Sequence, residues 1–165
     1  MPLSGPTFNI QPTQSQPTLN TYITVFNVIA AGAGNAVEIL GSASKTVAVS
    51  RIFLGKPSVG VTLVIRKQSA ASTGGASTTT TLVPLNSTNA AATSVVRQYT
   101  AVPAAGALVG EVYRNAVATT ETATVVFAGT PQFQNGILNG VAETLAVNID
   151  GAATIVGFIE WVEYS

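Results

Sequence analysis

The stretch that decides the fold is Ser58–Arg114, SVGVTLVIRKQSAASTGGASTTTTLVPLNSTNAAATSVVRQYTAVPAAGALVGEVYR. Its first part alternates as a half-buried strand does, with one face formed by Val59, Val61, Leu63 and Ile65. A linker of small residues, SAASTGGAST, follows, and then three short runs of β-forming residues, TTTLVPL, SVVRQYT and ALVGEVY. Pro, Gly, Asn or Ser closes each run. The stretch therefore predicts short strands joined by turns, and it contains no combination of reactive side chains.

Similar patterns predict strands on both sides of this stretch, at residues 22–29, 36–40, 45–54, 122–128, 143–150 and 154–164. In 45–54 the apolar phase slips by one residue, which predicts a bulge or bend near Ser50. Nine or so short strands with no convincing helix indicate an all-β fold, an antiparallel β-sandwich of jelly-roll-like form. We expect this domain to span residues 21–165.

The last predicted strand is apolar on both faces. Ile155, Ile159 and Trp161 share one face, and the other face is formed by Val156, Phe158, Val162 and Tyr164. An antiparallel sheet with one side in water should alternate apolar and polar residues instead. We therefore expect another subunit or the N-terminal segment to cover the second face, with Phe158, Val162 and Tyr164 as contact residues.

Residues 1–20 carry four prolines, several glutamines and no charged side chain, which argues against a packed helix or a central strand. We expect an extended N-terminal arm that lies along a partner, anchored by Phe8 and Ile10. A disordered tail is the alternative interpretation.

Composition excludes several classes of site. The 165 residues include no cysteine and no histidine, which excludes Ser–His–Asp and Cys–His nucleophiles and zinc sites built on imidazole or thiolate. Glu160 and Glu163 fall on opposite faces of a strand, so they cannot form a glycosidase pair, and we expect Glu160 to pair with an arginine. Asp150 suits an Asp-Gly turn better than a Ca²⁺ site. We expect no enzyme activity, metal or cofactor.

The charge content limits the possible partners. Seven basic and seven acidic residues give a net charge of zero, which disfavours a nucleic-acid or anionic-lipid partner. Only 8% of residues are charged, compared with about 25% in an ordinary soluble domain. Either Thr and Ser replace charge on the surface, or other subunits cover much of it. The longest apolar stretch, 22–33, is too short to span a membrane, and we expect no signal peptide.

Two parts of the chain resemble small head decoration (cement) proteins of tailed bacteriophages. The first part is VTLVIRKQSAASTGGASTTTTLVPLNSTNAAATSVVRQYTAVPAAGALVG. It resembles those proteins in the order of four pieces: a V-T-L strand with basic residues, an S-T-G-G linker, a V-P turn and a Y-T-A-x-P turn. Leu145–Asn148, Gly151 and Ile159–Trp161 resemble the end of those proteins. The resemblance implies a homotrimer that binds the major capsid protein on the outer surface of the phage head. It also implies assembly in the host cytoplasm and residence in the virion.

Two other functions remain open at this point. A phage fibre or host-recognition module would bind glycans, with Tyr99, Tyr113 or Phe133 exposed to stack on sugars. A non-viral assembly or surface-array subunit would polymerise by itself instead of forming a closed trimer.

Overall fold

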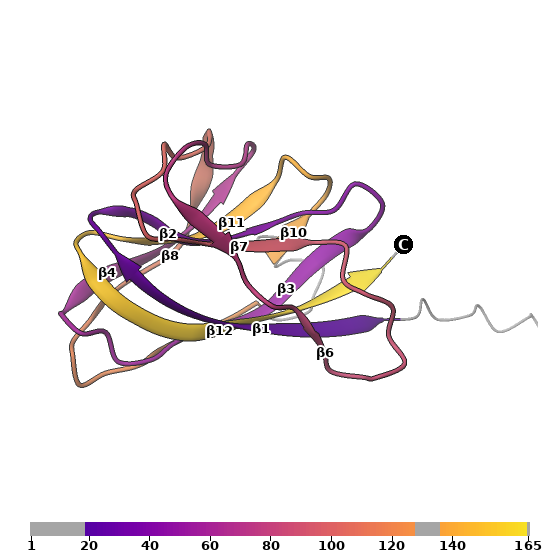
Figure 1. The fold of residues 1–165 in the computed structure, drawn as a ribbon, viewed down its shortest axis with the longest axis horizontal. Coiled ribbons are helices and arrows are strands. Elements are labelled where there is room, and N and C mark those ends of the chain that lie inside the picture. The colour runs from indigo at the N-terminus through magenta and orange to yellow at the C-terminus, as the bar shows by residue number, and fades with distance from the viewer. Residues whose placement is uncertain (1–18, 128–135, 165) are drawn as a thin grey trace, which may run out of the picture.

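The protein is a two-layer sandwich of antiparallel strands (Figure 1). The computed structural model describes residues 19–127 and 136–164. Within these ranges the structure contains strands arranged in two sheets, and no helix there is long and apolar enough to cross a membrane. The predicted all-β antiparallel sandwich is confirmed. The predicted arm, with Phe8 and Ile10, lies outside the described residues.

The first sheet contains six strands: β1 (Asn20–Ala30), β3 (Thr46–Leu54), β6 (Val83–Pro84), β9 (Ala123–Val126), β10 (Ile137–Leu138) and β12 (Ala153–Tyr164). Their order is β10-β3-β12-β1-β6, and β9 also pairs with β3. The longest pairing joins β1 to β12, in register from Asn20 opposite Glu163 to Ala30 opposite Ala153. Figure 1 shows these two strands side by side along one layer.

The second sheet also contains six strands: β2 (Gly34–Leu40), β4 (Val61–Gln68), β5 (Ser77–Thr79), β7 (Val95–Tyr99), β8 (Leu108–Val117) and β11 (Thr144–Ile149). Their order is β5-β7-β2-β11-β4-β8. Most connections between the described strands pass from one sheet to the other.

The core lies between the sheets and is built by the alternation that the sequence predicts. Ile155, Ile159 and Trp161 of β12 are fully buried, and Trp161 stacks on Tyr22 with ring centroids 5.7 Å apart. Fully burying one such aliphatic side chain stabilises a fold by roughly 1.5–3 kcal/mol. This single face of β12 is therefore a major contribution to stability.

The predicted irregularity at Ser50 is confirmed. The register between β12 and β3 shifts there, because Glu160 lies opposite Arg51 while Trp161 lies opposite Val49. Ser50 is the extra residue, and its hydroxyl donates a hydrogen bond of 2.9 Å to the carbonyl oxygen of Glu160. The bulge allows β3 to keep apolar residues in the core on both sides of the slip.

Three local predictions were wrong. The run TTTLVPL is in a strand only at Thr79 and at Val83–Pro84, because β5 begins in the small-residue linker at Ser77 and ends at Thr79. Val59 precedes β4 and is exposed. Strand β11 is buried on both faces, although its sequence alternates. On its outer side Thr144 donates a hydrogen bond to Gln68 of β4, and Gln68 donates in turn to Gly106 in the segment that follows β7.

We predict that Gly157→Ala will destabilise the sandwich. A Cβ atom at this position in β12 would collide with the carbonyl oxygen of Phe53 and with the ring of Phe26. Overpacking of this kind costs about 1–3 kcal/mol in the free energy of unfolding. Urea denaturation followed by the fluorescence of Trp161 measures the change. Gly110→Ala in β8 is the control, because its new Cβ would meet nothing within 4 Å, and equal losses in the two variants would contradict the prediction.

Candidate interaction surface

The outward side of the first sheet carries several apolar side chains, with a few polar residues between them. We call this set the outer apolar face, and its members are Val25, Ile29, Phe53, Val126, Val156, Phe158 and Val162. Val25 is 70% exposed, Ile29 69% and Val126 65%. Single exposed valines are ordinary, but a set that crosses four neighbouring strands forms a patch of the kind that marks interaction sites.

A row of paired residues forms the centre of the outer apolar face. Val25 of β1 lies opposite Phe158 of β12, which in turn lies opposite Phe53 of β3. The two phenylalanine rings stack with centroids 5.2 Å apart and an angle of 19° between their planes. Aromatic pairs in this geometry contribute about 0.5–1.5 kcal/mol beyond the area that they bury.

One ion pair lies beside these rings. The guanidinium carbon of Arg51 is 5.0 Å from the centre of the Phe158 ring, and Nη2 of Arg51 is 2.6 Å from Oε2 of Glu160. The predicted pairing of Glu160 with an arginine is therefore confirmed. Aromatic rings and arginine are enriched in the cores of protein–protein interfaces, and this cluster has that composition.

The predicted contact residues lie together on this sheet. Phe158, Val162 and Tyr164 all point outward from β12 and are half-buried, and Phe53 and Arg51 of the same chain account for part of the cover on Phe158. The sequence reasoning missed the two most exposed members, Val25 and Ile29. The signal was present, because β1 is apolar at both phases of its run YITVFNVI.

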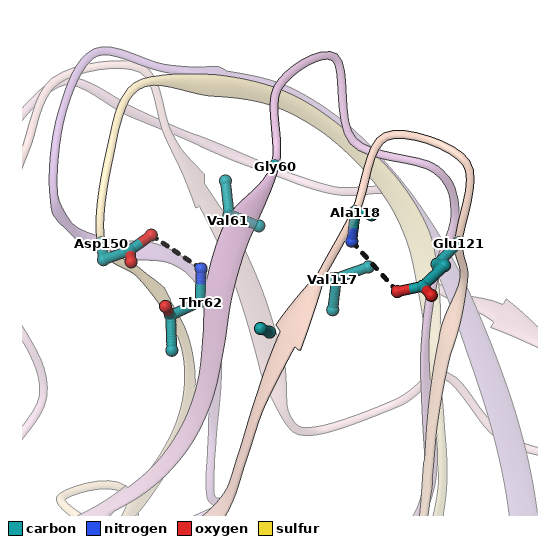
Figure 2. A pocket seen from close by; sticks show the side chains of 8 residues that line it. Gly60, Val61, Thr62, Val117, Ala118, Glu121 and Asp150 are labelled. Carbon is teal, nitrogen blue, oxygen red and sulfur yellow. Dashed lines mark hydrogen bonds between the residues drawn. The ribbon is translucent and has the colours of Figure 1, made fainter.

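A shallow pocket of about 360 Å³ opens between the start of β4 and the end of β8 (Figure 2). Two carboxylates lie at its rim, and each accepts a hydrogen bond from a backbone N–H. Asp150 accepts from Thr62 at 2.7 Å and Glu121 from Ala118 at 3.2 Å. The bonds from Thr62 hold the pKa of Asp150 below its ordinary value. Both carboxylates therefore stabilise the backbone of the neighbouring loops, and Asp150 lies in a turn, as its Asp-Gly sequence predicts.

A fully buried carboxylate joins the two sheets. Glu163 of β12 accepts hydrogen bonds from the backbone N–H groups of Thr93 and Ser94, both at 2.9 Å, and from their hydroxyls at 2.7 Å. The indole N–H of Trp161 is a further donor at 3.2 Å. Burial alone would raise the pKa of Glu163, but the hydrogen bonds outweigh it and the pKa is lowered. Because Thr93 and Ser94 lead into β7, the carboxylate fixes one sheet to the other.

A second buried carboxylate lies under the loop that follows β4. Glu38 accepts hydrogen bonds from the hydroxyl of Tyr99 at 2.8 Å and from the backbone N–H of Ser72 at 3.1 Å. Burial, followed by the hydrogen bond and the charge of Glu38, raises the pKa of Tyr99 to about 12. The glycan-binding alternative placed Tyr99 on the surface, and this is wrong, because Tyr99 is 2% exposed. Tyr113 is half-buried and packs on the core, and Phe133 lies outside the described residues.

In residues 19–127 and 136–164, no group of three or more acidic side chains is arranged to hold a metal ion. Glu38 and Glu163 are closed to solvent, and Glu160 is paired on the surface. What the described surface offers to a partner is the outer apolar face.

We predict that Glu163→Gln will remove part of the acid sensitivity of the protein. The pKa of Glu163 lies below the ordinary glutamate value of 4.5 in the folded state, so its stabilising effect is complete above that value and is lost as the pH falls through the folded pKa. At neutral pH the variant should lose about 1–3 kcal/mol, because charged acceptors form the stronger hydrogen bonds. Urea denaturation between pH 7 and pH 3 measures both effects, and the difference between wild type and variant should shrink at low pH.

Glu160→Gln is the matched control, since Glu160 lies three residues away on the same strand but pairs at the surface with Arg51. A surface ion pair contributes about 0–1 kcal/mol. A loss at neutral pH as large as that of Glu163→Gln would contradict the role given to the buried carboxylate.

We predict that Tyr99→Phe will flatten the alkaline limb of the stability curve. The folded protein keeps the Tyr99 proton up to a pKa of about 12, whereas the unfolded chain releases it near the ordinary value of 10.0. Stability therefore falls between these two values, by at most about 1.4 kcal/mol per pH unit from this group. Denaturation curves at pH 9 and pH 11.5 measure this slope, and an unchanged slope in Tyr99→Phe would contradict the assignment.

Comparison of the chain with protein-family models, with curated proteins and with solved structures finds no match in any of the three.

Proposed function

We propose that this protein is a structural component of a bacteriophage head, a decoration (cement) protein that binds the outer surface of the capsid as a homotrimer and stabilises the shell. The observation that carries the proposal is the outer apolar face, which crosses four strands and is exposed in a single chain. Val61–Gly110 and the C-terminal strands resemble such proteins, and this likeness is the reason for proposing a trimer on a phage head.

The physical properties of the surface suit this role. The outer apolar face has one ion pair at its centre and no excess of either charge, so its contacts depend little on salt. A trimer presents three equivalent patches, and once one has docked the others act at an effective concentration near millimolar. Weak neutral contacts then add up to tight binding, which stabilises the assembled shell relative to its free parts.

The outer apolar face also suits contacts between the subunits of the trimer. Interfaces between permanent subunits resemble a protein core cut in half, with aromatic residues at the centre and polar residues at the rim. The stacked pair Phe53 and Phe158 has aromatic rings at its centre, with Val25 opposite Phe158 on one side. On the other side the residue opposite Phe53 is the polar Thr124, and Val126 lies opposite Arg51. The proposal assigns the face to contacts within the assembled shell, either between sister subunits or with the capsid.

We predict that Val25→Asp will abolish shell binding without unfolding the chain. Val25 is 70% exposed, so the substitution removes few contacts within the monomer but places a charge in the centre of the proposed contact. A loss of about 1.4 kcal/mol or more corresponds to a tenfold or greater drop in affinity. Co-sedimentation with capsid shells of the phage that encodes the chain, at low and at high salt, measures the bound fraction.

Val109→Asp is the matched control, because Val109 is 61% exposed on β8 of the other sheet. It should bind shells as the wild type does, at either salt concentration. The proposed function is overturned if wild-type protein stays in the supernatant, or if the two variants bind equally well.

A further inference from the structure

Besides its exposed apolar side chains, strand β1 has an edge that is partly unpaired. Strand β1 pairs with β12 over its whole length, but on its other side β6 pairs only with Tyr22 and Ile23. Within the described part of the chain, no strand pairs with Val25–Ile29 on that side. An open edge of this kind is a template for an additional strand.

The backbone groups of this edge point toward the open side at alternate residues. The carbonyl oxygen of Thr21 accepts a hydrogen bond from Leu85 N–H there, and the N–H of Asn27 donates to the side chain of Gln98 at 3.2 Å. Because antiparallel pairing alternates regularly along an unbulged strand, Val25 and Ile29 present their N–H and C=O groups on the same side. Three residues of the edge can therefore bind an incoming backbone.

A groove runs along this edge. It has a volume of about 450 Å³ and lies between β1 and the segment that follows β5. Its lining consists of apolar, hydroxyl and amide side chains without a single charge: Val25, Phe26, Asn27, Thr79, Thr80, Thr81, Val83 and Gln98. An extended segment that is itself uncharged, with apolar residues on one side, fits such a groove.

The printed sequence contains one segment with these properties outside the described residues. Thr7–Gln11, TFNIQ, is a run of five residues between Pro6 and Pro12, it carries no charge, and Phe8 and Ile10 share one side of it. The stretch of β1 that β6 leaves unpaired runs from Thr24 to Ala30, and the part of it that begins and ends on an outward-pointing backbone, Val25–Ile29, has the length of this window. Proline cannot donate to a ladder, so the two prolines limit pairing to this window.

We propose that Thr7–Gln11 of one copy adds as a strand to Val25–Ile29 of a second copy. With the two windows aligned, Asn9 lies opposite Asn27 whether the strands run parallel or antiparallel. Phe8 and Ile10 then point into the groove beside Thr79–Thr81, and the three polar residues of the window face outward, as does the side chain of Asn27. The backbone of the incoming strand replaces the side chain of Gln98 as the acceptor for Asn27.

The length of the chain favours exchange between copies. To reach Val25 of its own chain, Gln11 must pass the six residues from Leu19 to Val25, about 20 Å, and the path must also go around β6, about 10 Å more. The eight residues from Gln11 to Leu19, which include two prolines, reach at most about 29 Å even when fully extended. The loop after β6 also lies on the route from Gln11 back to its own β1, because Leu85 and Asn89 of this loop both donate hydrogen bonds to the carbonyl oxygen of Thr21.

The absence of cysteine from the chain makes a direct test possible. Asn9→Cys and Asn27→Cys are made in separate full-length proteins, mixed at micromolar concentration and oxidised mildly. Residues opposite each other in a hydrogen-bonded pair have Cα atoms about 5.5 Å apart, within the range of a disulfide. Docking raises the local concentration from micromolar to about millimolar, so the mixed disulfide should form up to about a thousand times faster than in a control mixture.

The control mixture pairs Asn9→Cys with Asn115→Cys, an exposed asparagine on β8 of the other sheet. The proposal is overturned if the two mixtures cross-link at the same rate. It is also overturned if only the double variant Asn9→Cys, Asn27→Cys cross-links and does so within one chain, because the arm would then lie on its own copy.

A second measurement does not depend on the register of the pairing. Asn9→Pro removes a backbone donor at the centre of the window, whereas Gln14→Pro makes the same change outside it. Only Asn9→Pro should weaken self-association measured by light scattering, and equal effects would contradict the proposal.

The inference extends the proposed trimer, but its test is separate from the test of shell binding. If the cysteine variants cross-link and the protein does not co-sediment with shells, strand exchange stands and the decoration role is overturned. If the protein co-sediments and the variants do not cross-link, the decoration role stands and strand exchange is overturned.

Discussion

Strand β12 separates two environments, and the rest of the structure depends on what covers each of its faces. Its inner face completes the core through Ile155, Ile159 and Trp161. Its outer face carries Phe158 and Val162, and β1 and β3 place further apolar residues beside them. A sandwich that works as a monomer has no physical reason to repeat the core pattern on its outer side. The surface is intelligible as one side of a contact.

The interior contains a buried carboxylate that has no cationic partner among the described residues, in a chain with few charged residues. Glu163 is fully buried, and hydroxyls and backbone N–H groups surround it in place of arginine or lysine. A buried carboxylate with several charge-assisted hydrogen bonds can remain ionised without a cation. The many Ser and Thr residues therefore act inside the fold as well as on its surface, and Glu163 uses them to fix β12 to the segment that leads into β7.

The sequence predicts those parts of the structure that depend on neighbours along the chain. Alternation places the strands at 22–29 and 154–164 within a few residues of β1 and β12, and the phase slip predicts the bulge at Ser50. Thr93 and Ser94, which donate to Glu163, lie about seventy residues away from it, so no local pattern reveals them. In the same way, the burial of Tyr99 depends on Glu38 and on the loop through Ser72, which only the fold brings together. The sequence predicted the part of the outer apolar face that lies on β12. It missed the part on β1, because Val25 and Ile29 were not recognised as lying on the opposite face of that strand from Tyr22 and Phe26.

The central claim is that the outer side of the first sheet is covered by other chains in the working protein. The most direct measurement is the mass of the wild-type protein by multi-angle light scattering over a wide range of dilution. The account predicts a constant mass of three times 16.8 kDa. A mass of 16.8 kDa at every concentration would contradict the trimer on which the account depends.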